Sequence, residues 1–268
     1  KSMFAGSKEL ESIGNLSHWD VSRVTNMAWM FAESKVKFIG DLSNWNVSSV
    51  TNMGGMFTWS TIEQLGNLSN WNVSNVTSME WIFAWSELRQ IGNLSNWNVS
   101  NVTNMGGMFI VKYVDHVGDL SKWDVSNVTD MNGLFSECKF RTIGNISKWN
   151  VSRVTNMKSM FSMSELEIIG DLSNWNVSNV TNMEYMFAAS KFKNVGDLSH
   201  WDVSHVTDMR GMFYEAQLEN VGDLSNWNVS HVIDMNGMFY ETHLKTVGDL
   251  SNWHIANIRN LFTESKYK

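Results

Sequence analysis

Ten tryptophans divide the chain into units of equal length, and each is followed two residues later by Val or Ile. They recur every 26 residues, without insertion or deletion, at Trp19, Trp45, Trp71, Trp97, Trp123, Trp149, Trp175, Trp201, Trp227 and Trp253. A fixed period of this length is the signature of a repeat architecture, in which each unit buries its apolar face against its neighbours.

The spacing of apolar residues changes within each repeat. Trp45 and Val47 are separated by one polar residue, which is the period of a strand with one buried face. The next apolar residues recur at i, i+3, i+6 and i+7, which places them on one face of a helix. They are Val50, Met53, Met56 and Phe57. Each repeat is therefore predicted to contain a short strand and a helix of about two turns, with Ser48 or Thr51 as the N-cap.

A glycine lies two residues before the apolar residue that leads into each predicted strand. These glycines are Gly14, Gly40, Gly66, Gly92, Gly118, Gly144, Gly170, Gly196, Gly222 and Gly248. A position that is always Gly within one chain predicts a positive φ or a close approach of two backbones. The following residue is always Asn or Asp, whose side chain bonds its own backbone in turns. This segment is therefore predicted to be a corner.

These patterns predict an α/β fold, a right-handed leucine-rich-repeat-like solenoid of about ten 26-residue coils, each with a short parallel strand and a short helix. Residues 1–268 are predicted to form a single elongated domain, with the apolar rows stacked into one core. The terminal coils, residues 1–14 and 255–268, depart from the consensus, as terminal repeats do.

Composition narrows the classes of function. A formal charge of -7 without a basic cluster argues against nucleic acid as a partner. Neither an apolar run of about 18 residues nor an apolar segment in residues 1–14 is present, so no membrane insertion and no signal peptide are expected. The single cysteine, Cys138, excludes an internal disulfide framework and is expected to be a small buried hydrophobe.

One motif connects the chain to a known family. The sequence Leu-Ser-Asn-Trp-Asn-Val-Ser-Asn-Val-Thr-Asn-Met occurs in full at 94–105 and 172–183, and at 68–79 with Ser78 in place of one Asn. With this motif the chain resembles the BspA-like bacterial surface proteins, whose 26-residue repeats occur in lipoproteins and wall-anchored proteins of Mycoplasma, Listeria and lactobacilli.

The resemblance implies a leucine-rich-repeat-like coil and an extracellular location at the bacterial cell surface. It also implies adhesion or host-protein binding, and it brings no catalytic residues. The chain departs from the family in its anchor, because this segment shows neither a lipobox cysteine near its start nor a wall-sorting motif at its end.

Four tryptophans fall outside the 26-residue period, all in the predicted helices of the first three full repeats. They are Trp29, Trp59, Trp81 and Trp85. One interpretation is packing, because Trp29 and Trp81 share a row with Gly55 and Gly107 and could fill the gaps left by these glycines. The other is an exposed aromatic patch for binding or self-association, extended by Tyr113.

Histidines gather near the other end of the chain, on the predicted strand face. This group consists of His200, Asp202, His205, His231 and His254. Imidazole and carboxylate groups from adjacent coils could bind a divalent cation. The equivalent rows elsewhere hold Asn, Asp, Ser, Lys and Arg, so we expect solvated polar residues and no metal. A pH-sensitive surface is the intermediate interpretation.

The leading hypothesis is a non-enzymatic cell-surface repeat scaffold that mediates adhesion by binding a host or matrix protein, or a glycan. Its binding surfaces would be the polar strand face and the tryptophan-containing helical face. The alternative is a self-associating, filament-forming structural protein, and hence a homo-oligomer. An enzyme is not expected, because the sequence shows neither a nucleophile–base pair nor a phosphate-binding loop. No cofactor is expected.

Overall fold

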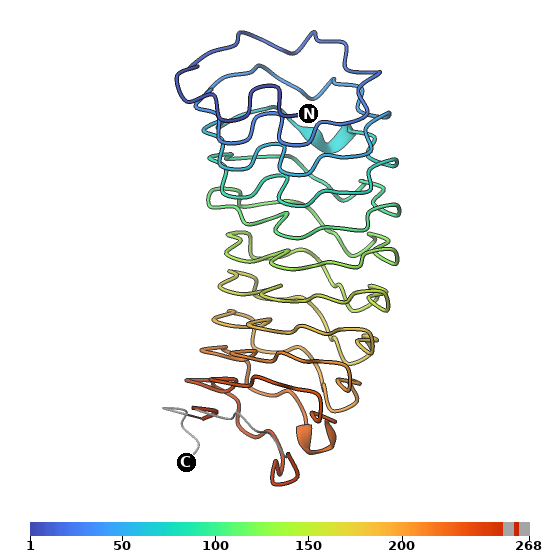
Figure 1. The fold of residues 1–268 in the computed structure, drawn as a ribbon, viewed down its shortest axis with the longest axis vertical. Helices are drawn as coiled ribbons and strands as arrows, with labels where there is room; N and C mark the ends of the chain where they lie inside the picture. Colours follow the sequence, from blue (N-terminus) through green and yellow to red (C-terminus); the bar gives the residue numbers. More distant parts are fainter. Residues whose placement is uncertain (254–259, 263–268) are drawn as a thin grey trace.

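The chain winds into a rod of coils stacked along one axis, from the N-terminal to the C-terminal end (Figure 1). The computed structural model describes residues 1–253 and 260–262. Each coil corresponds to one sequence repeat, because parallel bridges join residues 26 apart, such as Asn52 with Ser78 and Ser78 with Asn104. Regular helix in the described residues is limited to two short 3-10 helices, η1 (Leu68–Asn70) and η2 (Leu224–Asn226).

The predicted fold class is therefore wrong. An α/β, right-handed leucine-rich-repeat-like solenoid of strand–helix coils requires a sheet and helices. Within residues 1–253 and 260–262 there is neither an α-helix nor an extended strand, only isolated bridges between coils. The prediction of one domain over 1–268, with degenerate coils at 1–14 and 255–268, remains a prediction, and the structure describes only 260–262 of the last segment.

The segment predicted as a helix consists of consecutive turns bonded to the next coil. The N–H of Gly55 donates to the oxygen of Glu80 in that coil at 2.7 Å, whereas the N–H of Thr58 donates back to Gly55 at 3.2 Å. An α-helix would direct each N–H to the carbonyl four residues earlier. Turns closed by i→i−3 bonds produce nearly the same apolar spacing. Neither proposed N-cap acts as one: the Ser48 hydroxyl donates to a side chain two residues earlier, and Thr51 Oγ1 donates to the preceding coil.

The segment predicted as a strand lies between two turns. The N–H of Trp45 donates to Leu42 at 3.0 Å, and the N–H of Val50 donates to Val47 at 2.9 Å. Trp45 and Val47 are both buried, which explains the alternation of apolar and polar residues in the sequence. The parallel bridges lie further along the coil, at Asn52 and its equivalents.

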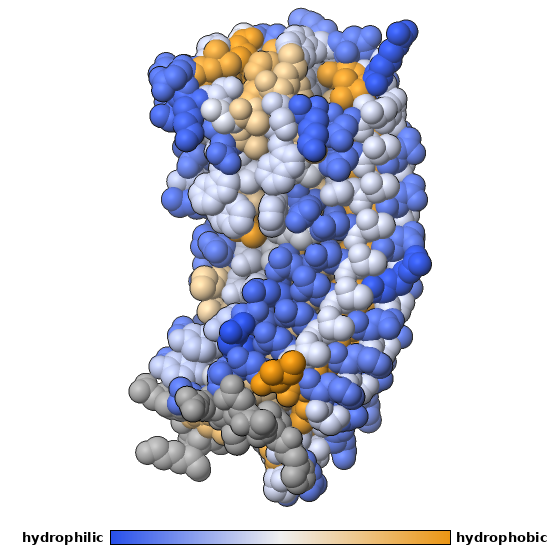
Figure 2. Space-filling model, in the orientation of Figure 1, coloured by the Kyte–Doolittle hydropathy of each residue, from blue (hydrophilic) through white to orange (hydrophobic). Residues whose placement is uncertain are grey.

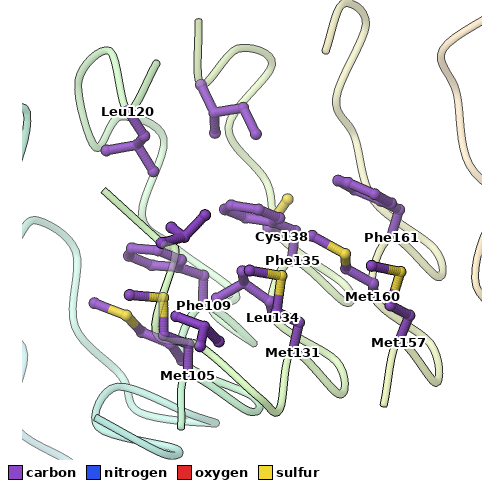
Figure 3. Close-up of a cluster of buried hydrophobic side chains, with 14 of the residues drawn as sticks. Met105, Phe109, Leu120, Met131, Leu134, Phe135, Cys138, Met157, Met160 and Phe161 are labelled. Carbon is purple, nitrogen blue, oxygen red and sulfur yellow. The ribbon is translucent and has the colours of Figure 1, made fainter. Parts of the chain in front are cut away.

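The rows of apolar residues line a single core that runs along the rod. Figure 3 shows the rings of Phe109, Phe135 and Phe161 on successive coils with methionines beside them; adjacent ring centroids are 5.6 and 5.7 Å apart. The periodic tryptophans from Trp45 to Trp227 are only 3–4% exposed, which confirms their burial in the core, whereas Trp19 of the first repeat is 38% exposed.

The consensus glycines form the predicted corners, with φ between 78° and 100°. Gly92 is also tightly packed, because a Cβ added to it would lie 2.0 Å from Asn67 Oδ1 of the preceding coil. The same Asn67 oxygen accepts a hydrogen bond from the N–H of Ser69 at 3.0 Å. Both the positive φ and the Asn/Asp turn are therefore confirmed, and one side chain couples the corners of two coils.

Candidate binding surface

The four tryptophans outside the period form one connected group, which we call the tryptophan cluster. Trp29 meets Trp81 edge to face with ring centroids 6.0 Å apart, and Trp81 lies 6.5 Å from Trp85. Trp85 and Trp59 are stacked, with centroids 4.9 Å apart and planes inclined by 15°. The structure therefore joins residues that are up to 56 positions apart in the sequence (85 − 29) into one surface.

Both interpretations of these residues describe part of the cluster. Trp29 covers Gly55, and a Cβ on that glycine would lie 2.4 Å from the ring. Trp81 covers Gly107 in the same way, at 2.1 Å. Trp59, in contrast, is 56% exposed. Trp29 and Trp81 therefore fill gaps above glycines, whereas Trp59 presents aromatic surface to solvent and stacks on half-buried Trp85. A role in binding stays a prediction.

The backbone of all four tryptophans is left-handed, with φ between 52° and 59°. This conformation costs a non-glycine residue roughly 1–3 kcal/mol. Gly133 and Gly237 occupy the positions equivalent to Trp29 and Trp81, with φ of 61° and 63°, so glycine satisfies the backbone there without strain. For Trp29 and Trp81, the packing of each ring over a glycine of the next coil contributes against this backbone cost.

A groove with a volume of about 280 Å³ opens beside the stacked pair, and we call it the aromatic groove. Its floor includes Ile110 and Val111, and its walls combine the two rings with charged side chains. These are Glu87, Lys112, Glu137 and Lys139. The groove thus spans four successive coils, and its lining combines apolar, aromatic and charged side chains.

Tyr113 lies next to the aromatic groove without ring contact to the tryptophans in the described part of the chain. Lys112 Nζ and the Arg89 guanidinium lie over its ring, 5.0 and 5.6 Å from the centroid. A hydrogen bond between the Lys112 and Tyr113 side chains is the main cause that raises the pKa of Lys112. Tyr113 is therefore connected to the aromatic groove through Lys112, which lines it, and its part in a binding surface stays a prediction.

His200, Asp202, His205 and His231 of the histidine group are exposed. His231 Nδ1 lies 2.9 Å from the oxygen of Ser204 in the preceding coil. Asn179 makes the equivalent contact two coils earlier, with Nδ2 donating at 2.7 Å. Histidine at this position therefore reproduces a structural contact of the repeat, which favours the solvated polar interpretation.

Asp202 and the remaining histidines complete this group. Hydrogen bonds from the Ser204 side chain and backbone lower the pKa of Asp202, and the charge of His205 adds to the effect. His200 is exposed, and His254 lies outside the described residues. Among the residues that the structure describes, no three metal-binding side chains gather at one point.

A second aromatic group, which the sequence analysis missed, lies near the C-terminal end. Tyr214 stacks on Tyr240 with centroids 4.8 Å apart, and Tyr185 contacts Tyr214 at 6.4 Å. Tyr185 shares a 26-residue row with Trp29 and Trp81, a signal that could have identified it. A hydrogen bond with Glu215 raises the pKa of Tyr214 to about 12.

Ion pairs between successive coils form ladders that the sequence analysis also missed. Glu184 is the most buried member, with its carboxylate 2.7 Å from Lys158 Nζ and 2.5 Å from Arg210 Nη2. Glu165 bridges Lys139 and Lys191, and Glu219 bridges Lys193 and Lys245. Residues of opposite charge 26 positions apart in the sequence could have predicted these ion pairs.

These features define a repeat protein of stacked 26-residue coils with an aromatic and charged outer surface. The chain belongs to the family described as Mycoplasma protein of unknown function, DUF285, whose model matches residues 1–114, 79–195, 110–217 and 188–266. A search of curated proteins and a search of solved structures each gave no match. In the described segments, no helix has the length and apolar character needed to cross a membrane.

Proposed function

We propose that the chain is a non-enzymatic repeat scaffold at the bacterial cell surface, where it mediates adhesion by binding a host or matrix protein, or a glycan. The observation that carries this proposal is the exposure of Trp59, 56%, while its ring is held against Trp85 at 4.9 Å. A large aromatic ring that is already immobilised loses little conformational freedom on binding, and such rings dominate the energy of many interfaces.

The extracellular location is supported by two observations. The repeated Leu-Ser-Asn-Trp motif resembles that of the BspA-like surface proteins, and the DUF285 model matches almost the whole chain. The repeat architecture supports a scaffold, because coils that contact only their neighbours build an extended surface for a partner.

The experiment is a binding screen of the purified chain against immobilised matrix proteins and a glycan array. We expect at least one ligand whose affinity falls tenfold or more in the Trp59→Ala/Trp85→Ala variant. The matched control is the His200→Asn/His205→Asn/His231→Asn variant, which substitutes the other candidate surface with residues found in equivalent rows. Unchanged binding by the tryptophan variant would remove this surface from the proposal.

Self-association is the second candidate function. The observation in its favour is a group of exposed apolar side chains on the first coil, formed by Met3, Leu10 and Trp19. Figure 2 shows apolar residues gathered at this end of the rod, whereas the middle of the visible face is largely polar. Size-exclusion chromatography with light scattering tests the idea, and a monomer at high protein concentration would contradict it.

A further inference from the structure

The cations of the aromatic groove already have partners within the chain. Lys112 Nζ lies 5.0 Å from the centre of the Tyr113 ring, and Lys139 Nζ lies 3.5 Å from the Glu165 carboxylate. An acidic ligand would have to displace these contacts before either ammonium group could bind it. The charges of both lysines are therefore partly engaged within the chain.

The carboxylates of the groove differ from the lysines in this respect. Neither Glu87 nor Glu137 forms an ion pair or a side-chain hydrogen bond with the residues that the structure describes, although the charge of Glu87 acts on nearby Arg89 and Lys112. The two glutamates lie two coils apart, a separation of roughly 10 Å for backbones spaced like neighbouring strands. Both carboxylates can therefore still form an ion pair with a ligand, and the net charge of the chain, -7, favours a cationic one.

The aromatic wall suits the same kind of ligand. A cation over the face of an indole is attracted by the negative potential of the ring, and Trp is the strongest of the aromatic residues in this interaction. The chain contains its own example nearby, since Lys112 and Arg89 both lie over the Tyr113 ring. The long apolar stem of a Lys or Arg side chain would fit against Ile110 and Val111 while its charge reached the carboxylates.

We infer that the aromatic groove receives a Lys or Arg side chain from a basic segment of a partner protein. Trp59 and Trp85 contact the apolar stem and the cation, and Glu87 and Glu137 neutralise its charge. This inference rests on the proposed function and names the chemistry of the partner. A neutral glycan would use the exposed indole but would leave both carboxylates without a counter-charge, so the charges favour the protein.

The experiment uses the purified chain and three probes, a labelled tetra-arginine peptide, a tetra-glutamate peptide and a neutral oligosaccharide, chitohexaose. Binding is measured by fluorescence anisotropy for the peptides and by calorimetry for the oligosaccharide. We expect binding of the arginine peptide only, with an affinity that falls as salt is raised. Glu87→Gln/Glu137→Gln should weaken this binding at least tenfold, and so should Trp59→Ala.

The matched control is Glu33→Gln/Glu241→Gln, which removes the same charge from exposed glutamates outside the groove; both share a 26-residue row with Glu137. This variant should bind the arginine peptide within twofold of the unmodified chain. Circular dichroism of every variant verifies that the fold is retained. Equal weakening by both glutamate pairs would show a nonspecific charge effect and would overturn the inference.

The remaining outcomes separate the inference from the proposed function. Binding of chitohexaose that depends on Trp59 and not on the two glutamates would overturn the cation inference and leave the proposed surface intact. Peptide binding that is unchanged in Glu87→Gln/Glu137→Gln would also overturn it. If Trp59→Ala/Trp85→Ala bound every probe and every ligand of the screen normally, the cation inference and the proposed binding surface would both be contradicted.

Discussion

The indole nitrogen of Trp97 donates a hydrogen bond to the main-chain oxygen of Leu68, 3.0 Å away in the preceding coil. Because this ring is buried and bonded, Trp97→Ala should lower the free energy of unfolding by about 3–5 kcal/mol. Trp59→Ala, the control, removes one exposed ring contact, worth about 0.5–1.5 kcal/mol. Urea denaturation measures both. Equal losses would contradict the division of tryptophans into core and surface.

Substitution of a corner glycine should be far more costly than substitution of a glycine with ordinary φ. Gly92→Ala places a Cβ 2.0 Å from Asn67 Oδ1 at a φ of 89°, so the side chain clashes and the backbone is strained. Gly106→Ala, the control, has no positive φ and its nearest atom is 3.2 Å away. We expect the melting temperature to fall by several degrees for Gly92→Ala and by much less for Gly106→Ala. A reversed order would disprove the role of the corner.

Acid should destabilise the fold through the aspartates of the turns. Hydrogen bonds from the serine two residues later lower the pKa of each below its ordinary value of 3.8. The aspartates concerned are Asp20, Asp41, Asp119, Asp124, Asp197, Asp202, Asp223 and Asp249. Since the folded pKa is depressed, the stabilisation is present above the unfolded value and is lost as pH falls through the folded value.

The measurement is the urea midpoint between about pH 5 and pH 2, which should fall towards the acid end. Asn67 shows that asparagine accepts the same hydrogen bond at an equivalent position. Replacing Asp41, Asp119 and Asp197 by Asn should therefore preserve the fold and reduce the slope. A slope that stays the same would assign the acid sensitivity to other groups.

The ladder around Glu184 should contribute more to stability than the exposed pair of Arg141 and Glu167. The Glu184 side chain is 8% exposed, and its removal in Glu184→Ala leaves Lys158 and Arg210 without their shared partner. Loss of a buried partner costs about 3–5 kcal/mol, and we expect the lower end because both cations reach solvent. Glu167→Ala should cost at most about 1 kcal/mol. Thermal unfolding of both variants tests this order.

Cys138 should be inert in the folded protein. Burial in the core is the main cause that raises the pKa of its thiol, so the reactive thiolate is scarce at neutral pH. Ellman's reagent at pH 8 should react with the chain only after denaturation. Rapid reaction of the native protein would show that this part of the core opens.

The inward rows could be predicted because burial depends on side-chain chemistry and on the period alone. The local backbone conformation could not be predicted from the sequence, because α-helices and consecutive i→i−3 turns place apolar residues at almost the same spacing. The difference lies in the partner of a single N–H: Gly55 bonds to Glu80 of the next coil instead of to its own segment. Whether this N–H bonds within its own segment or to the next coil depends on the stacking of whole coils.

The candidate site was only partly visible in the sequence. Trp59 and Trp85 are 26 residues apart, so their stacking follows directly from the period. The aromatic groove beside them does not follow from the period alone. It also requires Val111 and Lys112 from the coil after Trp85, and Glu137 from the coil after that. His231 makes a contact that asparagine makes in an equivalent position, so the histidine by itself does not mark a site.

The constant offset of 26 residues between bonded positions makes the length of the rod adjustable. Deletion of residues 144–169 would join Ile143 to Gly170, and every row would continue without a change of register. The aromatic groove, built before that point, would keep its composition, while the tyrosine group would move closer by about one interstrand spacing, 4.8 Å. Gain or loss of whole repeats can thus change the distance between surface features while each feature keeps its own chemistry.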